Sequence, residues 1–334
     1  MSETKLAPRR RGMVVWAAAA LATAAAGLWQ ASTGKAAMRF EKPITIVVTF
    51  PPGGGTDLLA RKLGAELQQR IGQTVVVENR PGASGNIGAR QVAEAAGDGS
   101  TLLMVNSTFA INPGVYQHLD FDPRKDFKPV FNAGTIASVL VVPQQSEVHT
   151  LGDALKLASS AAPLAFASCG NGTPQHMAGE MLAQAAQVRL QHVPYKGCGP
   201  AITAVAAGQV ALGVVTASSA TSLIEAGRVR AIAITAPQRV PQLADVPTVA
   251  EQGIQSFALE QWHGLLAPAT TPDAVVAHLN ETLNQILSVP EMQQALTQQG
   301  YTLLKQTPMQ FAQQIQIDMD RYAAVTHSLG LKVD

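Results

Sequence analysis

The stretch ITIVVTFPPGGGTD, residues 44–57, decides the fold of this chain. Residues 44–50 form a run of β-branched and apolar side chains, which predicts a strand. Two prolines and three glycines at residues 51–55 then predict a tight turn. From residue 56 to residue 71, leucines recur at helical spacing and predict a helix. A strand, a Gly-rich turn and a helix in this order are typical of α/β proteins that bind ligands at such turns.

The same alternation of short apolar runs and helical spacing continues along the chain. Repeated strand–helix alternation argues for parallel sheets with helices on both faces. We expect further strands at residues 75–79, 101–106, 139–142, 164–167, 189–193, 210–215 and 229–235, and helices at residues 87–96, 151–161, 174–187, 199–207 and 218–226.

Two places break this alternation, at residues 134–143 and 234–242, and we interpret both as crossings between two lobes. The C-terminal region holds two helical stretches, residues 273–289 and 308–329, without an evident sheet of their own. We therefore expect these helices to return to the first lobe. This assigns residues 38–137 and 238–334 to lobe 1 and residues 138–237 to lobe 2.

The N-terminus has the composition of an export signal. Three arginines at residues 9–11 precede an Ala-rich apolar run at residues 13–29, and small residues follow at residues 31–37, where a peptidase could cut. A permanent membrane anchor is the alternative, but the run is near the lower limit for spanning and Ala drives insertion weakly. We expect residues 1–37 to be a cleaved signal peptide and the protein to be periplasmic.

The composition excludes several classes of protein. The 334 residues are 47 % hydrophobic and 14 % charged, which excludes a disordered chain. Residues 1–37 hold five of the 24 basic and one of the 23 acidic residues, so the remainder carries 19 bases and 22 acids. Without a basic stripe interleaved with aromatics, we expect no nucleic-acid partner. The scattered histidines form no HExxH or Cys/His ligand spacing, so we expect no metal and no cofactor.

The chain has two cysteines, Cys169 and Cys198. In an oxidising compartment, the simplest expectation is a disulfide between them. The alternative is a nucleophilic Cys169 with His176 or His192 as its base. The sequence shows neither an acid that would orient the histidine nor an oxyanion site, so this alternative has no further support.

Gly-rich or short polar segments stand at the start of four expected helices or directly after strands, at residues 51–57, 106–108, 168–174 and 216–219. Glycines let the backbone approach a ligand closely, and a helix N-terminus offers unpaired N–H groups and partial positive charge. These properties suit a carboxylate or a phosphate. The pattern at residues 51–57 matches neither the dinucleotide nor the P-loop sequence, which leaves those ligands weakly supported.

A structural role for the same residues remains open. Thr56 or Asp57 could be the N-cap of the helix that follows residues 51–55. In the turn at residues 168–174, Thr173 suits the N-cap and Pro174 the first helical position.

Five segments follow one another along the chain: KPI and PPGGGTD within residues 42–57, ENRPGA at 78–83, CGNGTPQH at 169–176, HVPYKG at 192–197 and DVPTVAE at 245–251. Taken together, they resemble the Bug-type substrate-binding proteins of tripartite tricarboxylate transporters. The resemblance implies a periplasmic binding protein of the type II-like α/β fold, with two lobes joined by a two-crossing hinge. It also implies a small, often carboxylated ligand in the cleft and delivery to a membrane permease of two integral subunits.

The resemblance also implies which residues bind the ligand. The turn at residues 53–57 would hold a carboxylate through backbone N–H groups and ordered water, and the other residues would line the two lobes. Many members carry an acidic residue after the strand at 210–215, which this chain lacks, so recognition of an amino group is disfavoured. The residues carried over are Gly53, Gly54, Gly55, Thr56, Asp57, Asn106, Ser107, Thr108, Gly172, Thr173, His176, Thr216 and Ser218.

Two further functions compete with transport. A hydrolase using Cys169 or Ser107 is one, although no G-x-S-x-G elbow supports it. A periplasmic protein that senses a ligand and presents it to a partner would use the same cleft. For the transport function we expect a monomer whose partners are a small carboxylate and the permease subunits.

Overall fold

The computed structural model describes residues 1–3, 40–159 and 162–332. Residues Phe40–Asp334 form one compact unit, separate from Met1–Arg39. The expected signal peptide, apart from its first three residues, lies outside the described residues. Of the helices in the described residues, none combines the length and the apolar character that crossing a membrane requires.

Strands and helices alternate through most of the described chain. Their bounds are β1 (Ile44–Val48), α2 (Gly55–Ile71), β2 (Val75–Asn79), η1 (Ala83–Gly85), α3 (Asn86–Ala93), β3 (Thr101–Asn106), α4 (Thr108–Val115), β4 (Phe127–Pro143), α5 (Leu151–Ala158), β5 (Leu164–Ser168), α6 (Pro174–Ala186), β6 (Leu190–Pro194), α7 (Cys198–Ala206), β7 (Leu212–Thr216), α8 (Ala217–Glu225), β8 (Val229–Ile234), η2 (Pro241–Leu243), β9 (Glu260–Pro268), α9 (Asp273–Leu287), α10 (Pro290–Gln298), β10 (Tyr301–Leu303) and α11 (Pro308–Ser328).

Within the described residues, ten strands form a sheet with the order β2-β1-β3-β9-β4-β7-β5-β6, and β8 and β10 also pair with β4. β1 is parallel to β2 and β3, and β5 is parallel to β6 and β7. β9 is antiparallel to both β3 and β4, and β4 is antiparallel to β7. The α/β class is confirmed, but the expectation of purely parallel sheets is wrong at the centre.

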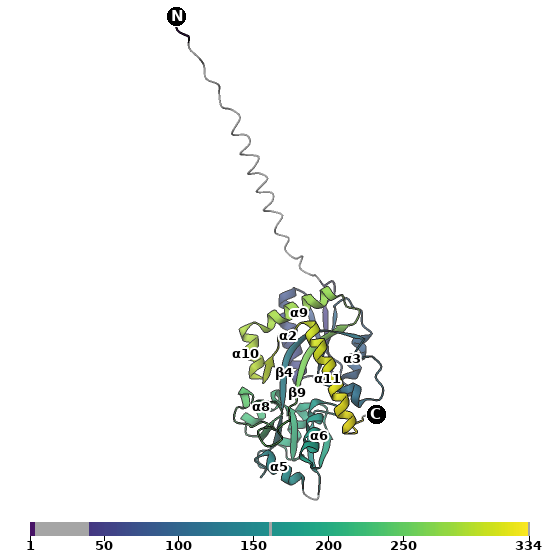
Figure 1. The fold of residues 1–334 in the computed structure, drawn as a ribbon, viewed down its shortest axis with the longest axis vertical. Coiled ribbons are helices and arrows are strands. Elements are labelled where there is room, and N and C mark those ends of the chain that lie inside the picture. Colours follow the sequence, from purple (N-terminus) through teal and green to yellow (C-terminus); the bar gives the residue numbers. More distant parts are fainter. Residues whose placement is uncertain (4–39, 160–161, 333–334) are drawn as a thin grey trace. The chain divides into compact units, whose positions relative to one another are not determined.

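The long strand β4 connects the two parallel groups. Its first part pairs with β9 and its last part pairs with β7 and β8, so it crosses from one group to the other as a continuous strand. The sequence predicts only residues 139–142 as a strand here. Two register shifts, between Pro129 and Phe131 and between Asn132 and Gly134, explain the difference, because bulges interrupt the alternation of apolar and polar side chains. In Figure 1, β4 and β9 run side by side, with α2, α9 and α10 above and α5, α6 and α8 below.

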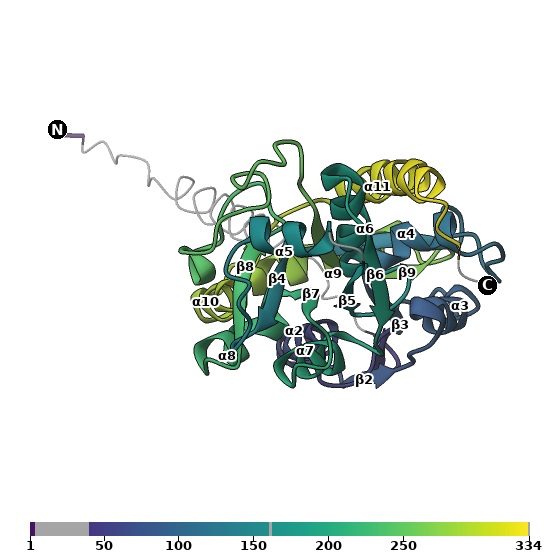
Figure 2. The same cartoon turned by 90° about the horizontal axis from the view of Figure 1, so that it is seen from below.

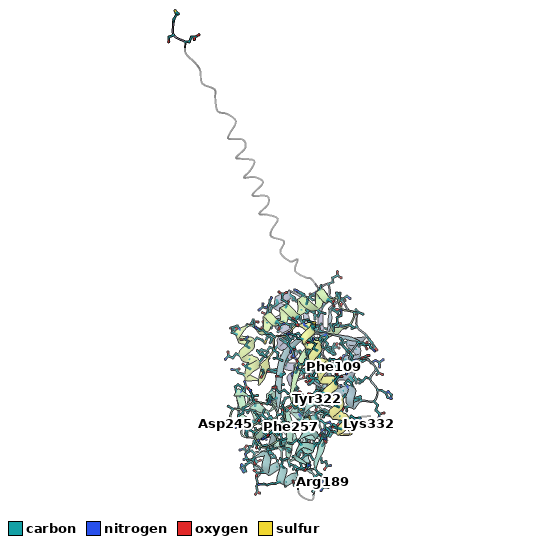
Figure 3. The ribbon with its side chains drawn as sticks, in the orientation of Figure 1. Phe109, Arg189, Asp245, Phe257, Tyr322 and Lys332 are labelled. Atoms are coloured by element: carbon teal, nitrogen blue, oxygen red, sulfur yellow. A yellow bond between two sulfur atoms is a disulfide. The ribbon has the colours of Figure 1, made fainter. Side chains whose placement is uncertain are left out.

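Buried apolar side chains cover both faces of the sheet. Figure 2 shows α6 and α11 on one side of the strands and α2 and α7 on the other. Leu63 of α2 and Leu283 of α9 belong to one core cluster, so α9 packs beside the helix that follows the first strand. Phe109 of α4 and Tyr322 of α11 belong to a second cluster and lie close together in Figure 3. These contacts fix the positions of the strand ends from which the site is built.

Candidate functional site

A cleft of about 480 Å³ opens where several strands end and helices begin. The first residues of α2, α7 and α8 line it, together with Thr173 before α6 and Asn106 at the end of β3. β9 contributes Gln261 and His263. Strand ends of an α/β sheet meet at a common edge, which explains why turns distant in sequence converge here.

The turn at residues 51–55 brings main chain rather than side chain into the cleft. Gly53 has a φ of +83°, in the left-handed region that favours glycine. A Cβ on Gly55 would lie 3.1 Å from the Oγ of Ser218, so this position is close to α8. Gly54 has an ordinary extended backbone, and a Cβ on it would meet only the carbonyl of Pro51 at 3.7 Å. The fold therefore does not require glycine at position 54, whereas an open cleft does.

The electrostatic character of the cleft favours an anion. α2, α7 and α8 all begin without a side-chain cap, so backbone N–H groups of their first turns remain available to a ligand. Each helix dipole adds partial positive charge at the same end. No Asp or Glu occurs among the described residues that line the cleft, and Lys196 supplies a cation. This combination suits a carboxylate or a similar anion.

The structure brings most of the sequence-predicted site residues together. Five of them lie behind the cleft wall rather than on it, namely Asp57, Ser107, Thr108, Gly172 and His176. The eight that line the cleft are Gly53, Gly54, Gly55, Thr56, Asn106, Thr173, Thr216 and Ser218.

The two expectations about helix caps have different outcomes. The N-cap of α2 is Gly54 and makes no side-chain hydrogen bond, so the capping role considered for Thr56 or Asp57 is wrong. Thr173 caps α6 as expected, because its hydroxyl accepts a hydrogen bond from the N–H of His176.

Asp57 supports the turn from below. Its side chain is 2 % exposed and accepts hydrogen bonds from the N–H of Gly53 at 2.9 Å, from Nε of Arg61 at 3.0 Å and from Nδ2 of Asn79 at 2.8 Å. Burial opposes ionisation, but these hydrogen bonds, with that of Arg61 the largest, outweigh it and lower the pKa of Asp57. Asp57 therefore connects the turn to α2 and β2.

Residues 106–108 fix β3 against β9. The Oδ1 of Asn106 accepts a hydrogen bond from the N–H of Thr108 at 2.9 Å. The Oγ of Ser107 accepts one from the N–H of Trp262 at 2.9 Å, and the N–H of Ser107 donates to the Trp262 carbonyl. Ser107 is fully buried, so its hydroxyl acts in packing these strands together.

His176 stacks on His192 behind the Thr173 turn, with ring centroids 3.8 Å apart. The Nδ1 of His176 accepts a hydrogen bond from the N–H of Gly172, and His192 Nε2 lies 2.6 Å from the Oγ of Ser168. Burial, together with the neighbouring His176, lowers the pKa of His192 to about 3. Through these two contacts the stacked pair holds the backbone of the turn at residues 168–174.

Among the polar side chains of the cleft that sequence reasoning missed are Gln175, Gln261 and His263. The Nε2 of Gln175 donates to the Oγ of Ser138 and to Oε1 of Gln261, so a buried amide pair joins α6 to β4 and β9. His263 lies between Thr56 and Tyr301: its Nε2 is 3.2 Å from the hydroxyl of Thr56, and its Nδ1 is 3.2 Å from the hydroxyl of Tyr301. Gln261 and His263 lie in a strand that the sequence pattern did not indicate, and only the pairing of β9 with β3 and β4 places them at the cleft.

The buried imidazole of His263 makes stability depend on pH. Complete burial lowers its pKa to about 3, whereas an unfolded histidine titrates near 6.5. The unfolded state therefore binds the proton more readily between these values, and stability falls as the pH decreases below about 6.5. At pH 5 we expect His263 alone to cost about 2 kcal/mol relative to pH 7.5. Urea denaturation of wild type and His263→Gln at both pH values tests this, and equal pH dependence of the two proteins would contradict it.

Cys169 and Cys198 form a disulfide, as expected. Both cysteines line the cleft, and the bridge joins the end of β5 to the first residue of α7. The disulfide therefore fixes the N-terminus of α7 at the cleft. Because its sulfur is bonded to Cys198, Cys169 cannot act as a nucleophile in the oxidised protein.

Removing the disulfide should lower stability measurably. The bonded cysteines are 29 residues apart, and closing a loop of this length stabilises the fold by about 3–4 kcal/mol in the chain-entropy model. We expect the Cys169→Ser/Cys198→Ser double variant to lose about this amount in urea denaturation. Alkylation of denatured, non-reduced protein should leave both cysteines unlabelled; stoichiometric labelling of one thiol in native protein would contradict the bridge.

In the part of the chain that the structure describes, no three His, Cys, Asp or Glu side chains gather as a metal site would need.

A comparison with models of known protein families shows to which family the chain belongs. The family model of the tripartite tricarboxylate transporter family receptor, TctC, matches residues 59–331. The chain belongs to the TctC receptor family.

Individual TctC relatives agree with this family. A UPF0065 protein from the tcbD-tcbE intergenic region of Pseudomonas sp. strain P51 is 39 % identical over 283 residues, 84 % of each chain. Protein BugT of Bordetella pertussis is 34 % identical over 296 residues, 87 % of this chain and 90 % of BugT. The resemblance to the Bug-type proteins is therefore confirmed.

Solved structures confirm the type II-like periplasmic binding protein fold. The periplasmic binding protein BugD superimposes with a TM-score of 0.82 at 32 % identity, over 88 % of this chain and 99 % of BugD. R. palustris Rpa4515 with adipate gives a TM-score of 0.84 at 30 % identity, with the same coverage. MatC from Rhodopseudomonas palustris with bound malate gives 0.79 at 31 % identity, over 86 % of this chain and 99 % of MatC.

Proposed function

We propose that this TctC receptor captures a small organic acid in the cleft and delivers it to the permease subunits of a tripartite tricarboxylate transporter. One observation carries the proposal: three uncapped helix N-termini converge on a cleft whose described lining residues include no Asp or Glu. Adipate in one similar structure and malate in another support a carboxylate as the ligand.

In this proposal, the ligand's carboxylate binds the main chain at the start of α2. N–H groups of Gly54, Gly55 and Thr56 are the donors, and Ser218 and Thr216 face them from α8 and β7. Thr173 and Asn106 add hydroxyl and amide groups to the same cleft. Asp57 and His176 act indirectly, because each hydrogen-bonds a glycine of a cleft turn from behind.

The proposed binding motion is a hinge between two lobes. Residues 38–137 and 238–334 would form lobe 1 and residues 138–237 lobe 2. The division is supported by the two parallel strand groups, β1–β3 and β5–β7, which β4 connects. The end of β8 near residues 234–242 would be the second crossing.

We further propose that the protein is a monomer without a cofactor and has no enzymatic activity. The hydrolase alternative loses both of its nucleophiles, because Cys169 is in a disulfide and Ser107 is buried against Trp262. Ser168 lies close to His192 but is fully buried, so a substrate does not reach its hydroxyl.

Native mass spectrometry of gently purified protein tests the function directly. We expect a bound carboxylic acid in a one-to-one complex, recovered chemically unchanged after release and rebinding in calorimetry. Conversion of the released compound by fresh protein would contradict the transport function and favour an enzyme.

We propose export to the periplasm with cleavage of residues 1–37. The arginines at residues 9–11 and the Ala-rich run after them support this. N-terminal sequencing of the osmotic-shock fraction should show a mature start between about residues 32 and 40. Protein retaining Met1 in the membrane fraction would show an anchor instead.

A further inference from the structure

A second chamber of about 510 Å³ adjoins the cleft. The second chamber lies directly beside the cleft, because six residues line both cavities: Phe50, Pro51, Cys169, Thr173, Lys196 and Gly197. The proposed anion site leaves this second chamber unexplained, since the uncapped N-termini of α2 and α8 line only the first.

The second chamber differs from the first in chemistry. Its exposed lining is mostly apolar and includes the rings of Tyr116, Tyr195, Pro81 and Pro194. The described residues that line it include no Asp or Glu, and Lys196 stands at its border with the cleft. Flat tyrosine rings beside apolar proline side chains present the kind of surface on which a planar hydrocarbon group packs well.

Hydrogen bonds hold the walls of this chamber in place. The Oγ of Ser84 donates to the carbonyl of Asn171 at 2.6 Å and accepts from the hydroxyl of Tyr116 at 3.0 Å. Nδ2 of Asn112 donates to the Ser84 carbonyl. These contacts maintain Ala83 and Ser84 at φ values of +45° and +52°, a left-handed conformation that is unfavourable for both residues. The Ser84–Asn171 hydrogen bond joins the two proposed lobes, so the chamber, like the cleft, lies between them.

We infer that the ligand is an aryl-substituted carboxylic acid, with its acid group at the helix N-termini of the cleft and its ring in the second chamber. The inference rests on the proposed function and specifies the class of substrate. A short aliphatic diacid would occupy the cleft alone and leave the tyrosine and proline surface without a contact. Lys196, at the border, lies where the acid group and the ring would join.

Paired acids that differ only by a phenyl group test this inference. Calorimetry would compare succinate with 2-phenylsuccinate, and acetate with phenylacetate. In wild type we expect the phenyl-bearing member of a pair to bind about tenfold or more tightly, from burial of the ring. Tyr195→Ala should bring this ratio close to one, whereas Tyr195→Phe, which keeps the aromatic wall, should preserve it.

The outcomes separate the inference from the proposed function. Unsubstituted acids that bind as tightly as their phenyl derivatives in wild type would overturn the inference and leave the proposed function intact. A phenyl preference that is unchanged in folded Tyr195→Ala would overturn the placement of the ring. If no acid of either pair binds, the inference fails, and native mass spectrometry of the captured compound decides the proposed function separately. The wild-type ratio requires no variant and therefore stands even if Tyr195→Ala does not fold.

Discussion

Replacing Gly54 by valine should weaken ligand binding by about 100-fold or more, because the branched side chain would occupy the space of the carboxylate and remove at least two charge-assisted hydrogen bonds. The fold should tolerate the change. Gly54 has φ −79° and ψ 166°, and only the Pro51 carbonyl lies within 4 Å of its added Cβ. Calorimetry with the captured acid measures the affinity, and urea denaturation measures the stability.

The matched control is Gly152→Val in α5. This glycine also has room for a Cβ, with Thr150 Oγ1 the nearest atom at 3.6 Å, and it does not line the cleft. It should bind the acid as wild type does. If Gly54→Val bound the ligand with unchanged affinity, the turn at residues 51–55 would not be the carboxylate site.

Removing the carboxylate of Asp57 should produce the second large effect, on stability and binding together. Asp57→Ala leaves the donors of Gly53, Arg61 and Asn79 without their acceptor beneath the turn. We expect a loss of about 2 kcal/mol or more in the free energy of unfolding, since hydrogen bonds to a buried charge are strong and their loss leaves unpaired groups. Affinity should fall as well, because Gly53 would no longer hold the turn in its binding conformation.

Two comparisons make the Asp57 result specific. Asp57→Asn retains the shape and one acceptor, so we expect it to lose less stability than Asp57→Ala. Asp153 of α5 is a half-buried aspartate of a capping box away from the cleft, and Asp153→Ala should leave affinity unchanged. Wild-type affinity in Asp57→Ala would show that the turn is rigid without this carboxylate.

The sequence predicted those helices and strands that begin and end where the spacing of apolar residues and the turn residues change. The spacing of the leucines predicted α2, and short β-branched runs gave β2 and β3 at their observed bounds. β9 and most of β4 were missed because their residues, such as the run EQWHG at 260–264, alternate poorly and become strands through pairing with each other. The antiparallel centre of the sheet is therefore a tertiary feature.

The candidate site likewise contains residues that local sequence patterns predict and residues that only the tertiary fold brings to the cleft. Turns rich in glycine, serine and threonine were predictable, because their backbone chemistry is local. His263 and Gln261 were not, because they reach the cleft only through the position of β9 between β3 and β4. The role of Asp57 as an acceptor for Gly53 also depends on Asn79 of β2, a contact across 22 residues that no spacing rule indicates.

A crystal structure of the protein with its captured acid tests the central claim most directly. We predict one carboxylate of the acid within hydrogen-bonding distance of the backbone N–H groups at residues 54–56, with Ser218 on its other side. A ligand bound outside this cleft, or a carboxylate held by Lys196 alone and away from the start of α2, would contradict the account.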